Sequence, residues 1–283
     1  MNDSLALKDI FERELSREDL ELPSLGSVAL KVARLLENEE VDLRELAGLI
    51  ETDAALTAKV LNLANSAFYA GLNRVKTVER AIGRVGLGST RNFLMADSLK
   101  HSFTGRNEQL RATFDCNWRH SLGAAICCKR IAEHINLRSI ADDAYLLGLV
   151  HDIGVISILN TLENHQDRLE TSLNQDLITE ITLAFHAPLS ARILEKLSFD
   201  EKFVRLSAVH HEPETYAQQE DPLFNILMVS DNLMLKVGLG LRPDPTIALM
   251  GLPYSARLGL DAMFFAVAEV DVEDIMLNAD SQL

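Results

Sequence analysis

A histidine followed directly by an aspartate closes an apolar run in the middle of this chain. His151 and Asp152 come after residues 144–150, which are almost all apolar, and Gly154 follows two positions later. Both side chains are costly to bury unless they form hydrogen bonds or coordinate a metal, and glycine commonly ends a helix. Taken alone, the pair is as compatible with a capped helix end at the surface as with a buried site.

Five further residues with nitrogen or oxygen ligand atoms lie on, or at the end of, segments with helical apolar patterns. Helical proteins build buried metal sites from such side chains, which project inward from several helices. Any single histidine of this kind could be a core residue with satisfied hydrogen bonds, but the whole series predicts a metal site. The seven candidate ligands are His120, His151, Asp152, His186, His210, His211 and Asp231.

Apolar residues recur at helical spacing throughout, and no strand-like alternation is found before residue 105. Asp42 with Glu45 resembles a capping box, and Asp53 and Thr77 are suited to cap the next helices. The polar stretch 102–109 separates this part from a longer series of helices. We therefore predict an all-α protein of two lobes, an N-terminal helical bundle (residues 1–105) packed on a helical core (residues 106–283).

Charge and cysteine content narrow the class of protein. The chain has 42 acidic and 27 basic residues, a net charge of −15, which would repel nucleic acid. Three cysteines do not form a disulfide framework, which favours a reducing cytoplasm. The first residues lack the layout of a signal peptide, and no apolar run approaches the roughly 20 residues that span a bilayer. We expect a cytoplasmic protein that binds neither nucleic acid nor a membrane.

The order of the candidate ligands, H…HD…H…HH…D on helices, resembles the HD superfamily of metal-dependent phosphohydrolases, particularly the HD-GYP phosphodiesterase core. Residues 22–36 and 43–69 resemble the opening helix and the hallmark segment of the HDOD family, a bacterial signalling relative of that core. Together the resemblances cover roughly residues 20–240. They imply an HD-superfamily fold for the second lobe.

The resemblance also implies a chemistry for the ligands. Asp152 occupies the position at which the superfamily bridges two metal ions, so it is both a ligand and the candidate catalytic residue. Nitrogen and oxygen ligands without thiolate suit Fe or Mn better than Zn or Mg. Two such divalent ions can hold a hydroxide and clamp phosphate oxygens during in-line displacement.

Three departures from the enzymes of this superfamily bear on activity. Cys116 stands where HD-GYP enzymes have a glutamate, and it is a possible extra ligand. Val155 replaces a lysine that holds substrate phosphate, and residues 213–216 replace the Gly-Tyr-Pro loop. The leading interpretation is therefore a metal-binding regulatory protein of signal transduction. The alternatives are an active metal-dependent phosphohydrolase and a scaffold without metal.

Two further expectations concern partners. We expect the N-terminal lobe to bind a protein partner or a second copy of the chain, and the metal site to accept a phosphate-containing small molecule. Asn65 and Ser66 either brace the two lobes against each other or simply close the end of a helix through hydrogen bonds to the backbone.

Overall fold

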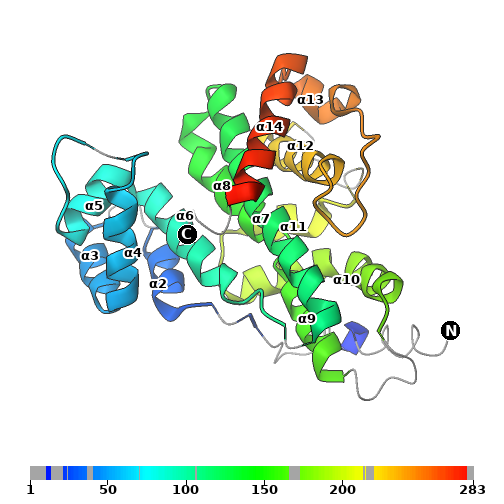
Figure 1. Cartoon of the computed structure of the whole chain (residues 1–283), viewed down its shortest axis with the longest axis horizontal. Coiled ribbons are helices and arrows are strands. Elements are labelled where there is room, and N and C mark those ends of the chain that lie inside the picture. Colours follow the sequence, from blue (N-terminus) through cyan, green and yellow to red (C-terminus); the bar gives the residue numbers. More distant parts are fainter. Residues whose placement is uncertain are drawn as a thin grey trace. The chain divides into compact units, whose positions relative to one another are not determined.

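The computed structural model of the chain contains helices and turns and no strand among the residues that it describes (Figure 1). The prediction of an all-α protein is therefore confirmed. The structure describes residues 11–13, 22–23, 25–36, 41–69, 71–105, 107–165, 173–212, 214 and 220–278, without the side chains of residues 109 and 273–278.

Two compact units divide the chain. One is Ser24–His101, and the other joins Ser102–Leu283 with Met1–Pro23. The sequence predicted a boundary between the lobes near residue 105, and of residues 1–23 the structure describes 11–13 and 22–23. Phe11, which is buried, makes an apolar contact distant in sequence, because its ring centroid lies 5.5 Å from that of Phe185.

The unit Ser24–His101, called the front unit below, is a bundle of short helices. Capping side chains set their starts as predicted: Asp42 accepts from the amide of Arg44, Asp53 from that of Ala55, and Thr77 from that of Arg80. The helices are α2 (Ser27–Leu35), α3 (Leu43–Glu51), α4 (Ala54–Ala64), α5 (Val78–Val85) and α6 (Leu87–Lys100).

The rest of the chain, called the rear unit, is built around the long helix α7, which packs on α8, α12 and α14, while α10 packs on α9 and α11. Its elements are α7 (Glu108–His134), η1 (Arg138–Ile140), α8 (Ala141–Val150), α9 (Gly154–His165), α10 (Gln175–Lys196), α11 (Glu201–Val209), α12 (Pro222–Lys236), η4 (Leu249–Gly251), α13 (Pro253–Arg257) and α14 (Ala262–Asn278).

Two glycines bring these helices close together. A Cβ at Gly148 would lie 2.7 Å from the carbonyl oxygen of Ala124 on α7. A Cβ at Gly154 would overlap the carbonyl oxygen of His186 on α10 and lie 2.7 Å from the amide nitrogen of Ser190. Gly154 begins α9 and does not end a helix with a positive φ. Its role is close approach of two helices, which differs from the helix-ending role that the sequence suggested.

Two segments of the rear unit are long and apolar enough to cross a membrane by length and composition, although the sequence had shown no continuous apolar run of that length. They are Arg138–His165 and Gln175–Lys196, and 83% and 61% of their apolar windows are buried within the protein. Core helices of soluble proteins show the same property, so this is weak support for a membrane span.

Candidate metal centre

The structure brings all seven candidate ligands together in the rear unit. Their atoms form two groups, and within each group the atoms lie within 4.8 Å of one another. The first group contains Asp152, His186, His210 and His211, and the second contains His120, His151 and Asp231. They come from α7, the turn between α8 and α9, α10, the end of α11, and α12.

Six of the seven side chains are buried, from His151, which is fully buried, to Asp152, which is 9% exposed, and only His211 is exposed. Buried polar side chains in proteins are hydrogen-bonded or bound to a metal. The hydrogen bonds of these imidazoles therefore decide what their inward-facing atoms can do.

Main-chain carbonyl groups hold the Nδ1 atom of the four buried imidazoles. Nδ1 of His151 lies 2.9 Å from the carbonyl oxygen of Gly148, and that of His186 lies 2.7 Å from Thr182. The corresponding distances are 2.8 Å for His210 to Ser207 and 3.3 Å for His120 to Leu239. A carbonyl only accepts, so Nδ1 carries the proton and a neutral ring presents an unprotonated Nε2.

These Nε2 atoms face one another in pairs. The distance is 3.3 Å between His120 and His151 and also 3.3 Å between His186 and His210. Two unprotonated nitrogens cannot hydrogen-bond to each other, so each pair needs a proton or a metal ion between its members. Nitrogens bound at about 2.0–2.1 Å to one ion lie roughly 3 Å apart. The spacing therefore fits the ligands of a metal.

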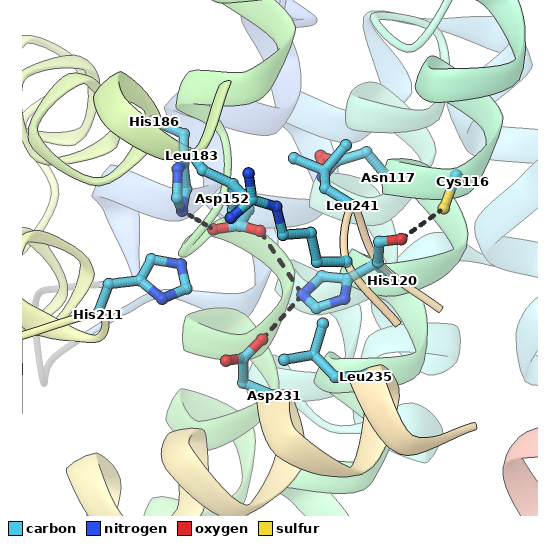
Figure 2. Close-up of a pocket in the computed structure, with 12 residues that line it drawn as sticks. Cys116, Asn117, His120, Asp152, Leu183, His186, His211, Asp231, Leu235 and Leu241 are labelled. Atoms are coloured by element: carbon cyan, nitrogen blue, oxygen red, sulfur yellow. Dashed lines mark hydrogen bonds and ion pairs between the residues drawn. The ribbon is translucent and has the colours of Figure 1, made fainter. Parts of the chain in front are cut away.

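The carboxylate of Asp152 lies between the two groups (Figure 2). Its Oδ1 lies 3.2 Å from Nε2 of His210 and 3.4 Å from that of His186, while Oδ2 lies 3.6 Å from Nε2 of His120. Oδ1 is buried and forms no hydrogen bond. Oδ1 also lies 3.6 Å from Nε2 of His151 in the second group, so the carboxylate is within reach of both groups, as a bridging carboxylate must be.

The electrostatics of the centre attract positive charge. Burial opposes ionisation of Asp152 and Asp231, but the nearby imidazoles hold both carboxyl pKa values below the ordinary range. Burial also disfavours the charged form of His120, yet the carboxylate of Asp231, 3.3 Å away, and that of Asp152 raise its pKa to about 9. Two anionic carboxylates are thus partly balanced by a proton on His120, and a metal ion competes with that proton.

Cys116 lies beside the centre and belongs to neither ligand group. Its thiol lies 3.6 Å from the carbonyl oxygen of Gly240, to which it donates. In this arrangement its sulfur is directed at the backbone of the loop that follows α12 (Figure 2).

A pocket gives access to the ligands. Its volume is about 80 Å³, room for several water molecules, since one needs at least about 10–15 Å³. Five of the seven candidate ligands line it, together with Cys116, Asn117, Leu183, Leu235, Gly240, Leu241 and Arg242. Of these seven residues, Cys116 alone was predicted from the sequence to lie at the site. Only Asn117 had a visible signal, because it lies one helical turn before His120.

The other residues singled out in the sequence have different places. The side-chain amide of Asn65 donates to the carbonyl oxygens of Leu61 and Val75 at 2.8 and 2.9 Å and accepts from the amide of Val75 at 2.8 Å. These bonds match the helix-closing alternative; the lobe-bracing role of Asn65 and Ser66 stays a prediction. Val155 is fully buried on α9. Of residues 213–216, only Glu214 lies within the described residues.

Comparison with known proteins is consistent with this architecture. The family model of the HDOD domain matches residues 22–213. A solved HDOD domain protein of unknown function from Geobacter sulfurreducens is 21% identical, with a TM-score of 0.74 and coverage of 100% of this chain and 98% of that one. A protein from Shewanella amazonensis SB2B, provisionally described as a metal-dependent phosphohydrolase, is 19% identical, with a TM-score of 0.70 and coverage of 96% and 100%.

An uncharacterized protein of Treponema pallidum (strain Nichols) is 24% identical over 215 residues, which are 72% of this chain. The chain spans 40% of the length of that relative. The HDOD match covers more than half of the chain and includes six of the seven candidate ligands, all except Asp231. The chain belongs to the HDOD family.

Proposed function

We propose that this protein is a metal-binding regulatory protein of signal transduction, in which ions at the rear unit stabilise or switch an assembly made through the front unit. One observation carries the proposal: four buried imidazoles have Nδ1 held by main-chain carbonyls and direct Nε2 toward two carboxylates. The Nε2 atoms of each pair lie 3.3 Å apart and need a proton or a metal ion between them, and this spacing suits two ligands of one ion.

The proposed occupants are two divalent ions. Asp152, His186, His210 and His211 would hold one, and His120, His151 and Asp231 the other, with Asp152 bridging. Imidazole and carboxylate ligands without thiolate favour Fe or Mn over Zn or Mg. Bound ions would supply Lewis acidity toward a phosphate group and would neutralise the buried carboxylates.

The residue at position 155 supports a regulatory function over catalytic turnover of a phosphate ester. Val155 is fully buried and does not line the pocket, so this position cannot hold a substrate phosphate. The competing function is hydrolysis of a phosphate ester at the same ions. The open pocket beside the ligands favours this alternative, because it has room for a small anion.

Assembly through the front unit is supported by exposed apolar side chains on the turn between α4 and α5. Phe68 is 86% exposed and Leu72 is fully exposed, and large exposed apolar residues mark interaction surfaces when they gather. The proposed partner is another protein or a second copy of the chain. A bacterial, cytoplasmic setting without nucleic acid or a membrane completes the proposal.

Elemental analysis of protein purified without chelator tests the metal, and a phosphomonoesterase and phosphodiesterase screen with added Mn tests turnover. We expect bound metal and no hydrolysis. Metal with hydrolysis that is lost in Asp152→Ala would support the enzyme instead. Protein with neither metal nor activity would contradict both and support a scaffold.

A further inference from the structure

The residues that line the pocket beside the candidate ligands are of two chemical kinds. The ligand wall carries the carboxylates of Asp152 and Asp231, whereas the loop after α12 contributes Gly240, Leu241 and Arg242. Apart from histidines, Arg242 is the one basic residue among those described that line the pocket. Its side chain is exposed, and no ion pair joins it to a described residue.

The loop that carries Arg242 has a fixed course. Gly238 and Gly240 have φ values of 90° and 140°, which side chains with a Cβ rarely adopt. The amide of Leu239 donates to the carbonyl oxygen of Met234 at 2.8 Å, and that of Asp244 donates to Leu235 at 3.0 Å. Arg242 is therefore presented by a turn that is tied to α12 on both sides.

The same turn contacts a candidate ligand. The carbonyl oxygen of Leu239 accepts from Nδ1 of His120 at 3.3 Å, and that of Gly240 accepts from the thiol of Cys116. The turn that positions the guanidinium group of Arg242 therefore also positions His120 of the second ligand group.

A second polar group of the pocket has no partner. Asn117, on α7 one turn before His120, is 4% exposed, and its buried Oδ1 forms no hydrogen bond. Figure 2 shows its side chain among the residues that line the pocket. Buried polar atoms without partners are uncommon in proteins, and this one lines the pocket. It is placed to bind a group of a ligand.

We propose that Arg242 and Asn117 form an anion-binding subsite for the phosphate group of a small molecule. The planar guanidinium pairs with two oxygens of a phosphate. The amide of Asn117 accepts from a hydroxyl of the phosphate or, in the other orientation of the amide, donates to one of its oxygens. The inference rests on the proposed function, because without bound cations the carboxylates of Asp152 and Asp231 would repel an anion.

Binding of inorganic phosphate and of phenyl phosphate to the full chain, purified with Mn, tests the subsite. Calorimetric titration should show saturable binding to the wild type. Arg242→Ala should weaken it about ten-fold or more, since a hydrogen bond to a charged group is lost. Arg242→Lys should fall between the two, because it keeps the charge without the planar fork.

Two further variants separate the subsite from general charge. Arg138 is exposed on η1 and does not line the pocket, so Arg138→Ala removes the same charge and should leave phosphate binding unchanged. Asn117→Asp nearly preserves the shape of the side chain and should weaken phosphate binding by adding a negative charge. Tighter binding of phenyl phosphate than of phosphate would identify a phosphate ester as the ligand class, and equal binding would identify free phosphate.

Metal content, measured on every sample, keeps the two proposals apart. Protein with metal that does not bind phosphate, or that binds it equally in the wild type and Arg242→Ala, overturns the subsite and leaves the metal centre intact. Protein with neither metal nor bound phosphate overturns both.

Discussion

The helix caps of the front unit and the metal centre of the rear unit use their polar side chains in opposite ways. In the front unit, Asp42, Asp53 and Asn65 hydrogen-bond to the backbone within a few residues of themselves or across one turn. In the metal centre, Asp152 and Asp231 accept no hydrogen bond from the backbone of a described residue and are directed instead at imidazoles from other helices. Polar residues that the local backbone does not account for are the ones that indicate function.

The buried carboxylates of the two units also differ in their partners. Asp97 of the front unit is buried beside the ammonium group of Lys59, with which it forms an ion pair. Asp152 has no lysine or arginine partner among the described residues, and its surroundings are imidazoles. The buried carboxylate of Asp97 is thus neutralised by an ammonium group, whereas the carboxylates of the metal centre are within reach of a cation held by the imidazoles.

The largest expected effect comes from removing the carboxylate of Asp152 in the rear unit, and removal of a carboxylate in the front unit serves as the control. Asp152→Ala should abolish metal binding and with it the stabilisation on adding Mn, about 4 kcal/mol at a thousand-fold excess over the Kd. Asp53→Ala, the matched control, removes a helix cap and should cost about 1 kcal/mol with full metal content. Elemental analysis and thermal unfolding with and without chelator measure both. Equal metal content in Asp152→Ala and Asp53→Ala would contradict the assignment of Asp152 as a metal ligand.

A second pair of variants concerns glycines. Gly154→Ala places a Cβ against the backbone of α10 and should cost about 1–3 kcal/mol or more, because a backbone cannot yield as a side chain does. Gly48→Ala lies within α3, has no atom within 4 Å of the added Cβ, and should stabilise by about 0.5–1 kcal/mol. Chemical denaturation measures both signs. A stabilising Gly154→Ala would show that α9 and α10 do not approach so closely.

A smaller effect is expected at Asn65. Asn65→Ala removes two hydrogen bonds that join the end of α4 to Val75 and a third to Leu61 within α4, and should cost about 1–2 kcal/mol. Because this loss is confined to the front unit, the metal content should stay that of the wild type. Hydrogen exchange should show faster opening in residues 65–75 alone. A loss of metal in this variant would instead support the lobe-bracing role.

The smallest effect concerns pH in chelator-treated protein. Burial opposes the charged form of His120, but Asp231 and Asp152 raise its pKa from 6.5 to about 9. The stability from this proton is complete below pH 6.5 and is lost as the pH rises through 9. Burial lowers the pKa of His151 from 6.5 to about 4, so its contribution is present above pH 6.5 and is lost as the pH falls through 4.

The melting temperature of the metal-free protein should therefore have a maximum near pH 6.5. Stabilisation by added Mn should increase with pH above that point, since fewer protons compete for the ligands. A series of melting curves with and without chelator measures both trends. A melting temperature that rises steadily from pH 6 to pH 9 without metal would contradict the charge balance described for His120.

The sequence by itself determined the helical class, the helix starts at Asp42, Asp53 and Thr77, and the seven candidate ligands in their order. These features depend on residues three or four positions apart, or on a motif, so they can be read along the chain. The capped helix starts and the HDOD resemblance needed no knowledge of packing.

Only the tertiary structure decided that the ligands meet, that Gly154 is needed for close approach, and that Phe11 packs with the rear unit. The proposed subsite of Asn117 and Arg242 depends on tertiary structure in the same way, because the turn after α12 brings Arg242 to a pocket that Asn117 of α7 also lines. The physical reason is that contacts between distant segments depend on the approach of whole helices, and no local pattern encodes which faces will meet.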